Sequence, residues 1–234
     1  MPTYNNVEYV RIMRPLPDFT QRDVYGIPFV EVDAINITHL GDGLWLTSLN
    51  NASSQDTMAS RKIVHSFKSD DVLRRCCNNP YKWLDRTAGY LAVSSFDISM
   101  DPGMECAQVL WATFLNRWSG AFAQAHGRKI VPTVGWTVPD HYDICFAGLR
   151  DGGVFLISTL GAHNDDSHGV FMDGYQELRR RFPKTRIICV GNRIEGMDDD
   201  VCYVKYRDSF GYRKKHFVWQ PPLLNWDMTM AQVD

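Results

Sequence analysis

Short apolar runs recur through the middle of the chain and are separated by segments with the spacing of amphipathic helices. The runs at 153–159 (GVFLIST) and 186–190 (RIICV) are almost wholly apolar, and those at 62–67, 91–95 and 129–134 are similar. Continuous apolar runs of this length are typical of strands that are covered on both faces in a parallel sheet. The pattern therefore predicts mostly parallel strands in a buried sheet.

Helix signals fill the intervals between these runs. Ser69 is a suitable N-cap for a helix over 70–78, and Pro80 suits the first turn of the next helix. A long helix is predicted from about 104 to 126, with Gly127 as its C-terminal stop, and a further amphipathic helix over 170–182. Strands and helices thus alternate along the chain, which is typical of the α/β class.

At least five strand-then-helix steps are present, which is too many for a β-sandwich and slightly few for a complete eightfold barrel. We favour an incomplete or distorted (β/α) barrel-like domain with mostly parallel strands. An open doubly wound α/β sheet is the alternative. Both architectures place functional loops at the carboxyl ends of the strands.

We expect one α/β domain over residues 1–234, because no segment resembles a linker. Its β/α core would be 63–192. The remaining predictions are an extended N-terminal arm over 1–33 with a short strand at 27–32, a strand at 35–40, a surface loop at 50–60, a short strand at 142–146, and a C-terminal strand or hairpin with an irregular tail over 201–234.

The net charge and the cysteine content limit the binding partners and the cellular compartment that we expect for this protein. The net charge is −2 and the pI is about 6.4, so the molecule lacks the cationic field that drives non-specific binding to nucleic acid or anionic membranes. The basic runs 179–181 and 213–216 are interpreted as solvated faces. Six cysteines without zinc-type spacing indicate reduced, mostly buried thiols. With no apolar run near about 18 residues, we expect a cytoplasmic protein without membrane contact.

Polar side chains follow the predicted strands at their carboxyl ends, where both architectures place their functional residues. Asp97 comes directly after the strand at 91–95 and could act as an acid or base if partly desolvated, or it could cap a turn together with Ser99. Trp136 could either stack on a ligand or pack in the core, whereas Trp111 and Trp118 of the long helix are expected in the core. The candidate ligand-binding residues are Thr133, Trp136, Ser158, Thr159 and Asn192.

The segment HNDDSHG offers His163, Asp165, Asp166 and His168 as ligands for a divalent metal ion. The competing interpretation is that Asp166 or Ser167 simply caps the helix that begins near Val170. Residues 198–200 (DDD) are interpreted as a hairpin turn. The sequence contains no dinucleotide fingerprint, no P-loop and no G-x-S-x-G motif, so it assigns no definite cofactor and no esterase-type nucleophile.

Six segments in order resemble a known family. They are FDIS (96–99), NRWSGAF (116–122), IVPTVGW (130–136), DICFAGL (143–149), ISTLG (157–161) and FMDGY (171–175). This order and spacing resembles domain-of-unknown-function family number four-four-one-seven, met in Gram-positive bacteria, their phages and integrative elements. Phe96 departs from the family pattern, which has proline there. The resemblance implies a mobile-element context and no agreed activity, substrate or cofactor.

The leading hypothesis is an enzyme acting on a nucleotide- or nucleobase-like polar ligand, with Asp97 and His163 as catalytic residues. The alternative is a non-catalytic module that binds nucleic acid or a host protein. Its contacts would come from the basic tail and the aromatic residues Tyr206, Phe210, Tyr212, Phe217 and Trp219. A third reading is a folded accessory protein with no small-molecule site. The sequence assigns no oligomeric state.

Overall fold

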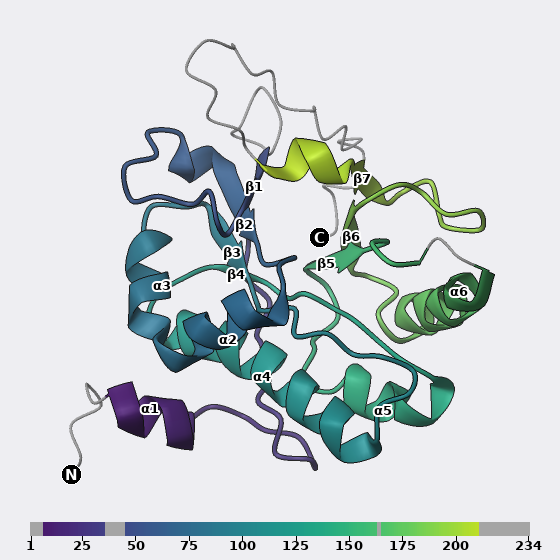
Figure 1. The fold of residues 1–234 in the computed structure, drawn as a ribbon, viewed down its shortest axis with the longest axis horizontal. Helices are drawn as coiled ribbons and strands as arrows, with labels where there is room; N and C mark the ends of the chain where they lie inside the picture. Colours follow the sequence, from purple (N-terminus) through teal and green to yellow (C-terminus); the bar gives the residue numbers. More distant parts are fainter. Residues whose placement is uncertain (1–6, 36–44, 163–164, 211–234) are drawn as a thin grey trace, which may run out of the picture.

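All the strands of the described residues pair in parallel with their neighbours. The computed structural model describes residues 7–35, 45–162 and 165–210. One sheet has the order β1 (Trp45–Ser48), β2 (Lys62–His65), β3 (Ala92–Ser94) and β4 (Ile130–Val131), and the other has the order β5 (Val154–Ser158), β6 (Arg186–Val190) and β7 (Cys202–Val204). Each pair of neighbours within the two sheets is parallel (Figure 1). The predicted parallel α/β class is confirmed.

The two sheets are joined beyond the end of β4. Thr133 and Leu156 form a parallel bridge, and Leu156 N donates to the Pro132 carbonyl at 2.9 Å. Strand order therefore follows chain order from β1 to β7, as it does around a barrel and not as in a doubly wound sheet, where the order reverses. The short helix η3 (Tyr206–Phe210) follows β7 and lies beside β1. Within the described residues no closed barrel forms, and the fold is open and incomplete.

The sheet is buried on both faces, which explains the continuous apolar runs. One hydrophobic cluster takes at least one side chain from each strand: Leu46, Ile63, Ala92, Val131, Val154, Leu156, Ile188, Val190 and Val204. The alternate residues Val64, Val93 and Ile130 pack in a second cluster against helices. Ile157, Ile187 and Cys189 pack in a third. Side chains on a strand alternate between faces, so β2, β3, β4, β5 and β6 each supply two separate clusters.

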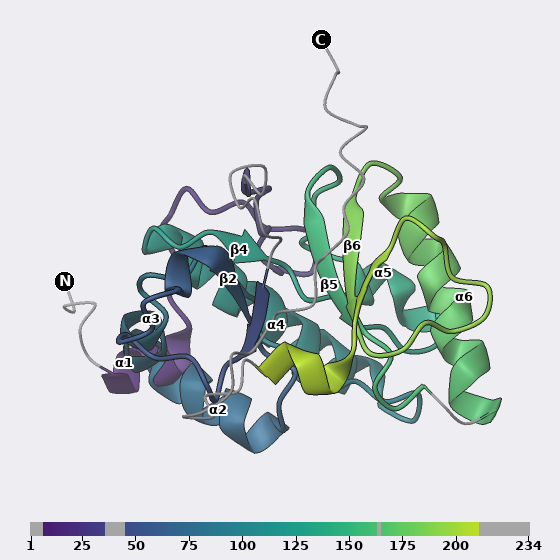
Figure 2. The same cartoon turned by 90° about the horizontal axis from the view of Figure 1, so that it is seen from above.

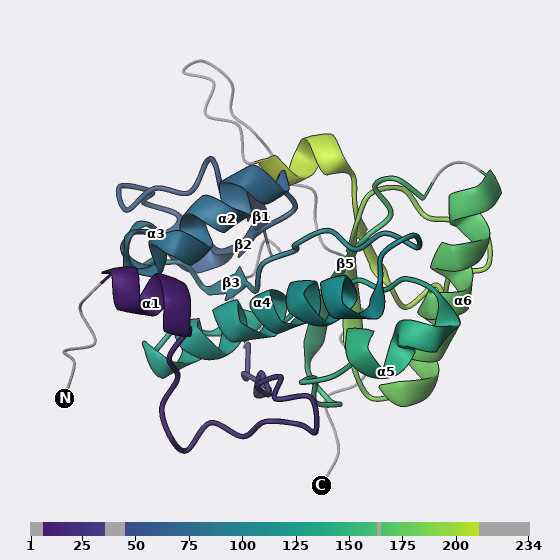
Figure 3. The same ribbon diagram turned by 60° about the horizontal axis from the view of Figure 1, so that its bottom comes forward.

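The four main helices form where they were predicted. They are α2 (Asp70–Asn78), α3 (Pro80–Arg86), α4 (Cys106–Ala125) and α6 (Asp165–Arg181). Gly127 ends α4 with a φ of +75°, a conformation that glycine adopts without strain. Helix α6 begins five residues earlier than predicted, at Asp165. Figure 3 shows α4 passing beneath the first sheet, where it packs against β4, and on towards α5, which it also contacts.

Two of the predicted strands are wrong. Residues 27–32 form no strand, because Asp23 accepts hydrogen bonds from Tyr25 N and Ile27 N and turns the chain, which then lies along α4. Residues 142–146 form α5 (Tyr142–Cys145), preceded by the turn η2 (Pro139–His141). In a helix, residues four apart share a face. Tyr142 and Phe146 accordingly pack together with ring centroids 5.6 Å apart.

The N-terminal arm carries a helix that the sequence interpretation missed, α1 (Val7–Met13). Arg14 follows it, donates to the Cys77 carbonyl and lies over the Trp118 ring, with 4.8 Å from guanidinium carbon to ring centroid. Further along the arm, Val30 N donates to the Gly148 carbonyl at 2.9 Å. These contacts attach the arm to α2, α4 and the segment after α5.

Several smaller predictions also have an outcome. Trp118 is buried as expected, but Trp111 is 48% exposed, so its assignment to the core is wrong. All six cysteines are free, and Cys77, Cys145 and Cys189 are buried. Residues 50–58 contain turns, as expected, and precede η1 (Ala59–Arg61). The predictions for 36–40 and 213–234 lie outside the described residues. None of the described helices has the length and apolar character needed to span a bilayer.

Candidate functional site

A cleft of about 690 Å³ opens at the carboxyl ends of β2, β3, β4 and β5. This is the edge at which a parallel α/β fold gathers its functional loops. The cleft is lined mainly by the segments that directly follow those strands, by the start of α6 and by η3. Its lining includes Phe67, Lys68, Asp97, Met100, Asp101, Gly135, Trp136, Ser158, Phe171 and Tyr206.

Asp97 lies half-buried in this cleft, three residues beyond the end of β3. The pKa of Asp97 is raised to about 7, first by desolvation on burial and then by the charge of Asp70, while Arg117 opposes the shift. Among the residues that the structure describes, none donates a hydrogen bond to its carboxylate. Asp97 therefore presents a carboxyl group that changes its charge near neutral pH and has hydrogen-bonding capacity left for a ligand.

Helix α4 fixes the position of Asp97 through the main chain on either side of it. The Asn116 amide accepts from Ile98 N at 2.7 Å and donates to the Ile98 carbonyl at 3.2 Å. The Ser119 hydroxyl accepts from Phe96 N at 2.8 Å. Both polar side chains are buried, so the bonds are shielded from water. The segment that carries Asp97 is consequently held from behind by two side chains of one helix.

Arg117 of the same helix holds the next part of the cleft wall. Its guanidinium is buried and donates to the carbonyls of Thr133, Cys145 and Ala147 at 2.8 to 2.9 Å. Desolvation lowers the pKa of Arg117 to about 10, which leaves it charged at neutral pH. This one cation therefore ties the segment after β4 to the segment around α5.

The three candidates with a hydroxyl group all donate a hydrogen bond to a main-chain carbonyl, but they differ in whether they reach the cleft. Thr133 is buried and donates to the Ser95 carbonyl at 2.9 Å, and Thr159 is buried and donates to the Asn192 carbonyl at 2.8 Å. Ser158 lines the cleft, and its hydroxyl donates to the Val190 carbonyl at 2.9 Å. These bonds join neighbouring strand ends, and of the three residues Ser158 alone lines the cleft. Asn192 itself is exposed and lies outside the cleft lining.

Trp136 forms an aromatic wall of the cleft together with Phe171. The two ring centroids lie 5.1 Å apart, and the Trp136 indole donates to the Phe171 carbonyl at 3.2 Å. The indole also lies directly against the backbone of α6, since a Cβ added to Gly174 would come within 2.0 Å of it. The position of Trp136 is therefore set by α6 as well as by its own loop.

Of the four metal ligands proposed from the sequence, the structure describes the side chain of one. His163 and the side chains of Asp165 and Asp166 lie outside the described residues, while His168 is exposed on α6. Among the side chains that are described, no group of three histidine, cysteine, aspartate or glutamate residues is arranged to hold a metal ion. The metal site proposed from the sequence stays a prediction.

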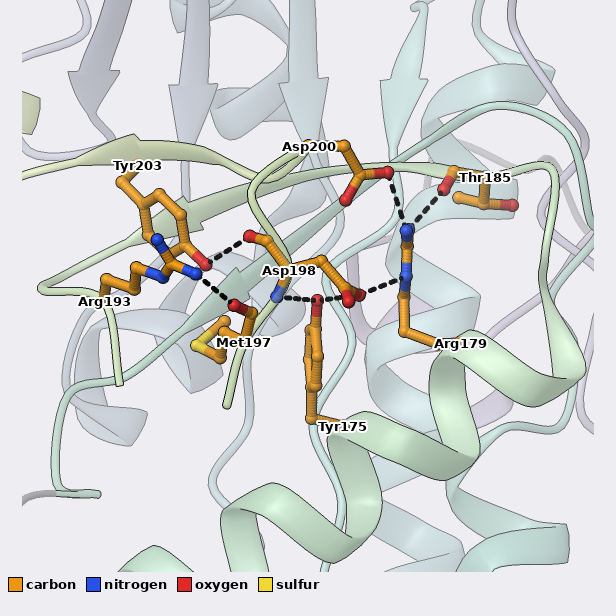
Figure 4. Close-up of polar contacts among 8 residues, drawn as sticks. All are labelled: Tyr175, Arg179, Thr185, Arg193, Met197, Asp198, Asp200 and Tyr203. Carbon is orange, nitrogen blue, oxygen red and sulfur yellow. Dashed lines mark hydrogen bonds and ion pairs between the residues drawn. The ribbon is translucent and has the colours of Figure 1, made fainter. Parts of the chain in front are cut away.

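The charged runs outside the cleft form a structural network. Figure 4 shows Arg179 of α6 between two aspartates of the β6–β7 connection, at 2.9 Å from Asp198 and 2.6 Å from Asp200. The Tyr175 hydroxyl donates to Asp198 at 2.7 Å. Because β6 and β7 are parallel, this connection is a crossover, and the prediction of a hairpin turn at 198–200 is wrong. The acidic run attaches the crossover to α6.

Sequence interpretation missed Asn116 and Arg117 as site-forming residues. A usable signal was present, because NRWS interrupts the apolar face of the long helix with buried polar side chains. Such residues require hydrogen-bond partners. The segments that carried the family resemblance also meet here: FDIS, IVPTVGW, ISTLG and FMDGY contribute to the cleft lining, and NRWSGAF and DICFAGL contribute to its support.

Comparison with known proteins gives a family and a phage association. The model of the family described as Domain of unknown function (DUF4417) matches residues 20–208. The Gene 1 protein of Mycobacterium phage L5 is 28% identical over 156 residues, which cover 66% of this chain and 68% of that protein. The Gene 1 protein of Mycobacterium phage D29 is 30% identical over 137 residues, which cover 58% of this chain and half of that protein. No solved structure matches the chain.

Proposed function

The chain belongs to the DUF4417 family, and from its cleft we propose that it binds a small polar ligand with a nucleobase-like ring and exchanges a proton with it through Asp97. The observation that carries this proposal is the Asp97 carboxyl group, which lies in the cleft with a pKa of about 7. General acid–base catalysis works best when the pKa of the catalytic group lies near the working pH. Asp97 meets this condition at neutral pH.

The shape and lining of the cleft support a planar ligand. Its volume of about 690 Å³ falls in the range of small-molecule sites, which are mostly apolar with a few directing polar groups. Trp136 and Phe171 supply aromatic surface on one side, and Met100 and Val134 supply further apolar surface. Aromatic side chains stack favourably on the flat face of a base, at about 1–3 kcal/mol per base. Asp97 would then address the polar edge of the same ring.

The supporting frame also favours a binding site, because it holds Asp97 rigidly. Asn116 and Ser119 fix the main chain on both sides of Asp97, and Arg117 fixes the segment that leads to Trp136. A site works best when its directing groups are held in place by a second layer of hydrogen bonds. In this proposal the two buried threonines and Asn192 act as support, and Asp97 and Trp136 are the residues that contact the ligand.

Ligand-induced thermal stabilisation tests the proposal. The panel should contain nucleobases, nucleosides and nucleotides, and the protein variants should be wild type, Asp97→Asn and Asp85→Asn. Asp85 is exposed on α3 and serves as the matched carboxylate control. We expect at least one base-containing compound to raise the melting temperature of the wild type and of Asp85→Asn, but not of Asp97→Asn. A panel without any effect on the wild type would refute the proposal.

The alternative function, a nucleic-acid-binding module, concerns mainly residues beyond 210, which the structure does not describe. Retention of DNA and RNA at two salt concentrations separates the two functions. Phosphate contacts release counterions, so binding of that kind weakens steeply as salt increases. Strong, salt-sensitive retention that is unchanged in Asp97→Asn would favour the alternative.

A further inference from the structure

The charge of the cleft limits the kind of ligand that it accepts. Lys68 is the single basic side chain among the described residues that line it, and two carboxyl groups, Asp97 and Asp101, line it as well. Desolvation lowers the pKa of Lys68. Sites for di- and triphosphates normally combine several cationic or main-chain N–H donors. The charge balance therefore favours an uncharged ligand.

The unused hydrogen-bond acceptors of the Asp97 carboxylate limit which donor groups the ligand must carry. An ionised carboxylate only accepts hydrogen bonds, and its two oxygens bind two parallel N–H donors well. No described side chain or main-chain group supplies such donors. The Gly135 backbone passes close to this carboxylate, because a Cβ added there would lie 3.9 Å from Asp97 Oδ1 and 3.3 Å from the Met100 methyl group, so a larger residue would intrude on the space beside Asp97. A ligand edge with two adjacent N–H groups would complete this site.

Guanine has such an edge, formed by its ring N1–H and its 2-amino group, whereas adenine offers one amino group beside an acceptor nitrogen. We propose that the cleft takes an uncharged purine of the guanine type, as the base or the nucleoside, with the two N–H donors on Asp97 and the ring against Trp136 and Phe171. This inference rests on the proposed function and names its ligand class.

The protonation state of Asp97 gives the inference a distinctive pH dependence. When Asp97 is ionised it accepts both donors, and when it is protonated one of its oxygens becomes a donor that repels an N–H group. Affinity for guanosine should therefore fall as pH decreases through about 7. The charged or titratable groups around Asp97 are Asp70 on α2, Arg117 on α4, Lys68 after β2, Asp101 before α4 and Tyr206 on η3.

Isothermal titration calorimetry of the full chain with guanosine, inosine, adenosine and GTP at pH 6 and pH 8 tests the inference. Inosine is the matched control ligand, because it keeps N1–H and lacks the 2-amino group. We expect guanosine to bind about tenfold or more tightly than inosine and adenosine at pH 8, since each hydrogen bond to a charged group contributes at least about this factor. Guanosine affinity should drop roughly tenfold at pH 6, and GTP should bind more weakly than guanosine.

The outcomes separate this inference from the function on which it rests. Asp97→Asn should remove the preference for guanosine and flatten its pH dependence, while Asp85→Asn should change neither. Equal or tighter binding of adenosine, or tighter binding of GTP, with the dependence on Asp97 retained would overturn the inference and leave the proposed function standing. Absence of binding by every nucleoside would overturn both.

Discussion

The buried guanidinium of Arg117 donates to the main-chain carbonyl of Thr133 across 2.9 Å, and so joins the centre of α4 to the strand end that precedes the cleft wall. The same side chain serves two further carbonyls, of Cys145 and Ala147. A cation in the interior is tolerated only when its donors are paired, and the carbonyls in turn depend on it.

Replacing Arg117 should therefore be costly. In Arg117→Ala three buried carbonyls lose their donor, and we expect the free energy of unfolding to fall by about 3–5 kcal/mol, measured by urea denaturation. Arg117→Lys keeps the charge with fewer directed donors and should recover part of the loss. The control is Arg11→Ala, which removes an exposed ion pair with Glu8 and should cost below about 0.5 kcal/mol. Equal effects of Arg117→Ala and Arg11→Ala would contradict this account.

Substitutions of Asn116 should lower both the stability of the fold and ligand binding at Asp97. Asn116→Asp keeps the size and the acceptor but loses the donor to the Ile98 carbonyl, and it places a charge near Asp97. We expect a loss of about 2 kcal/mol in unfolding free energy. Asn116→Ala should destabilise to a similar extent and also weaken ligand binding, because the Asp97 segment loses both bonds. Normal binding with reduced stability would show that Asn116 supports the fold without positioning Asp97.

Strands β2 to β6 could be predicted from sequence because they fall in the continuous apolar runs typical of strands buried on both faces, whereas β1 (Trp45–Ser48) was not predicted. The predicted run at 186–190 coincides with β6, and the residues after β2, β3, β4 and β5 gather at one edge, whereas Asn192, which follows β6, lies outside the cleft. Asp97, Trp136 and Ser158 were thus brought together by topology alone. Parallel strands that follow one another in space must bring their carboxyl ends to the same side.

Other features depend on information that a single sequence does not hold. Ser158 lines the cleft, while its neighbour Thr159 is buried and bonded to the Asn192 carbonyl, since adjacent residues at a strand end point in different directions. Predicting which of the two faces the cleft requires the register. The segment at 142–146 was too short for periodicity to distinguish a strand from the helical turn of α5.

His65 should make stability depend on pH. Its Nε2 donates to the Ser209 carbonyl at 2.9 Å, and Phe67 N donates to its Nδ1 at 3.4 Å, so the ring is neutral in the fold. Desolvation lowers the pKa of His65 to about 4, against an ordinary value of 6.5, with the bond to Ser209 opposing the shift. The unfolded chain thus takes up a proton before the folded chain as pH falls.

The His65 contribution to unfolding free energy should be constant above pH 6.5 and should decline by about 3 kcal/mol between pH 6.5 and 4. Urea denaturation across this range checks it. His65→Gln removes the titration and should flatten that part of the profile. His168→Gln, an exposed histidine on α6, should leave the profile unchanged. A wild-type decline that survives in His65→Gln would assign the effect to another group.

The attachment of the β6–β7 crossover to α6 can be tested at Tyr175. This side chain is 2% exposed and donates to Asp198 at 2.7 Å (Figure 4). Tyr175→Phe removes only the hydroxyl, and we expect a loss of about 1–1.5 kcal/mol in unfolding free energy. Tyr203→Phe is the matched control, because its more exposed hydroxyl donates to the Asp198 carbonyl and should contribute about 0.5 kcal/mol or less. The reverse order of effects would show that the crossover is held elsewhere.

Two glycines of α6 offer a test of how the aromatic wall is positioned. A Cβ at Gly174 would lie 2.0 Å from Trp136 Cδ1 and 2.2 Å from its Nε1, whereas a Cβ at Gly169 would meet nothing within 4 Å. Gly169→Ala should stabilise the protein by about 0.5–1 kcal/mol, as expected for replacing glycine inside a helix. Figure 2 shows α6 along the outside of β5 and β6, a position from which it cannot move away without uncovering that sheet.

Gly174→Ala brings the same helix gain but must displace the indole, and overpacking of this kind costs about 1–3 kcal/mol. Relative to Gly169→Ala we expect a net loss of stability of about 1–3 kcal/mol, together with a changed Trp fluorescence spectrum and weaker binding of any ligand that stacks on Trp136. The comparison uses one helix and one substitution, so helix propensity cancels. Equal stability and equal spectra in the two variants would mean that Trp136 has room to move, and the wall of the cleft would then be set by its own loop and not by α6.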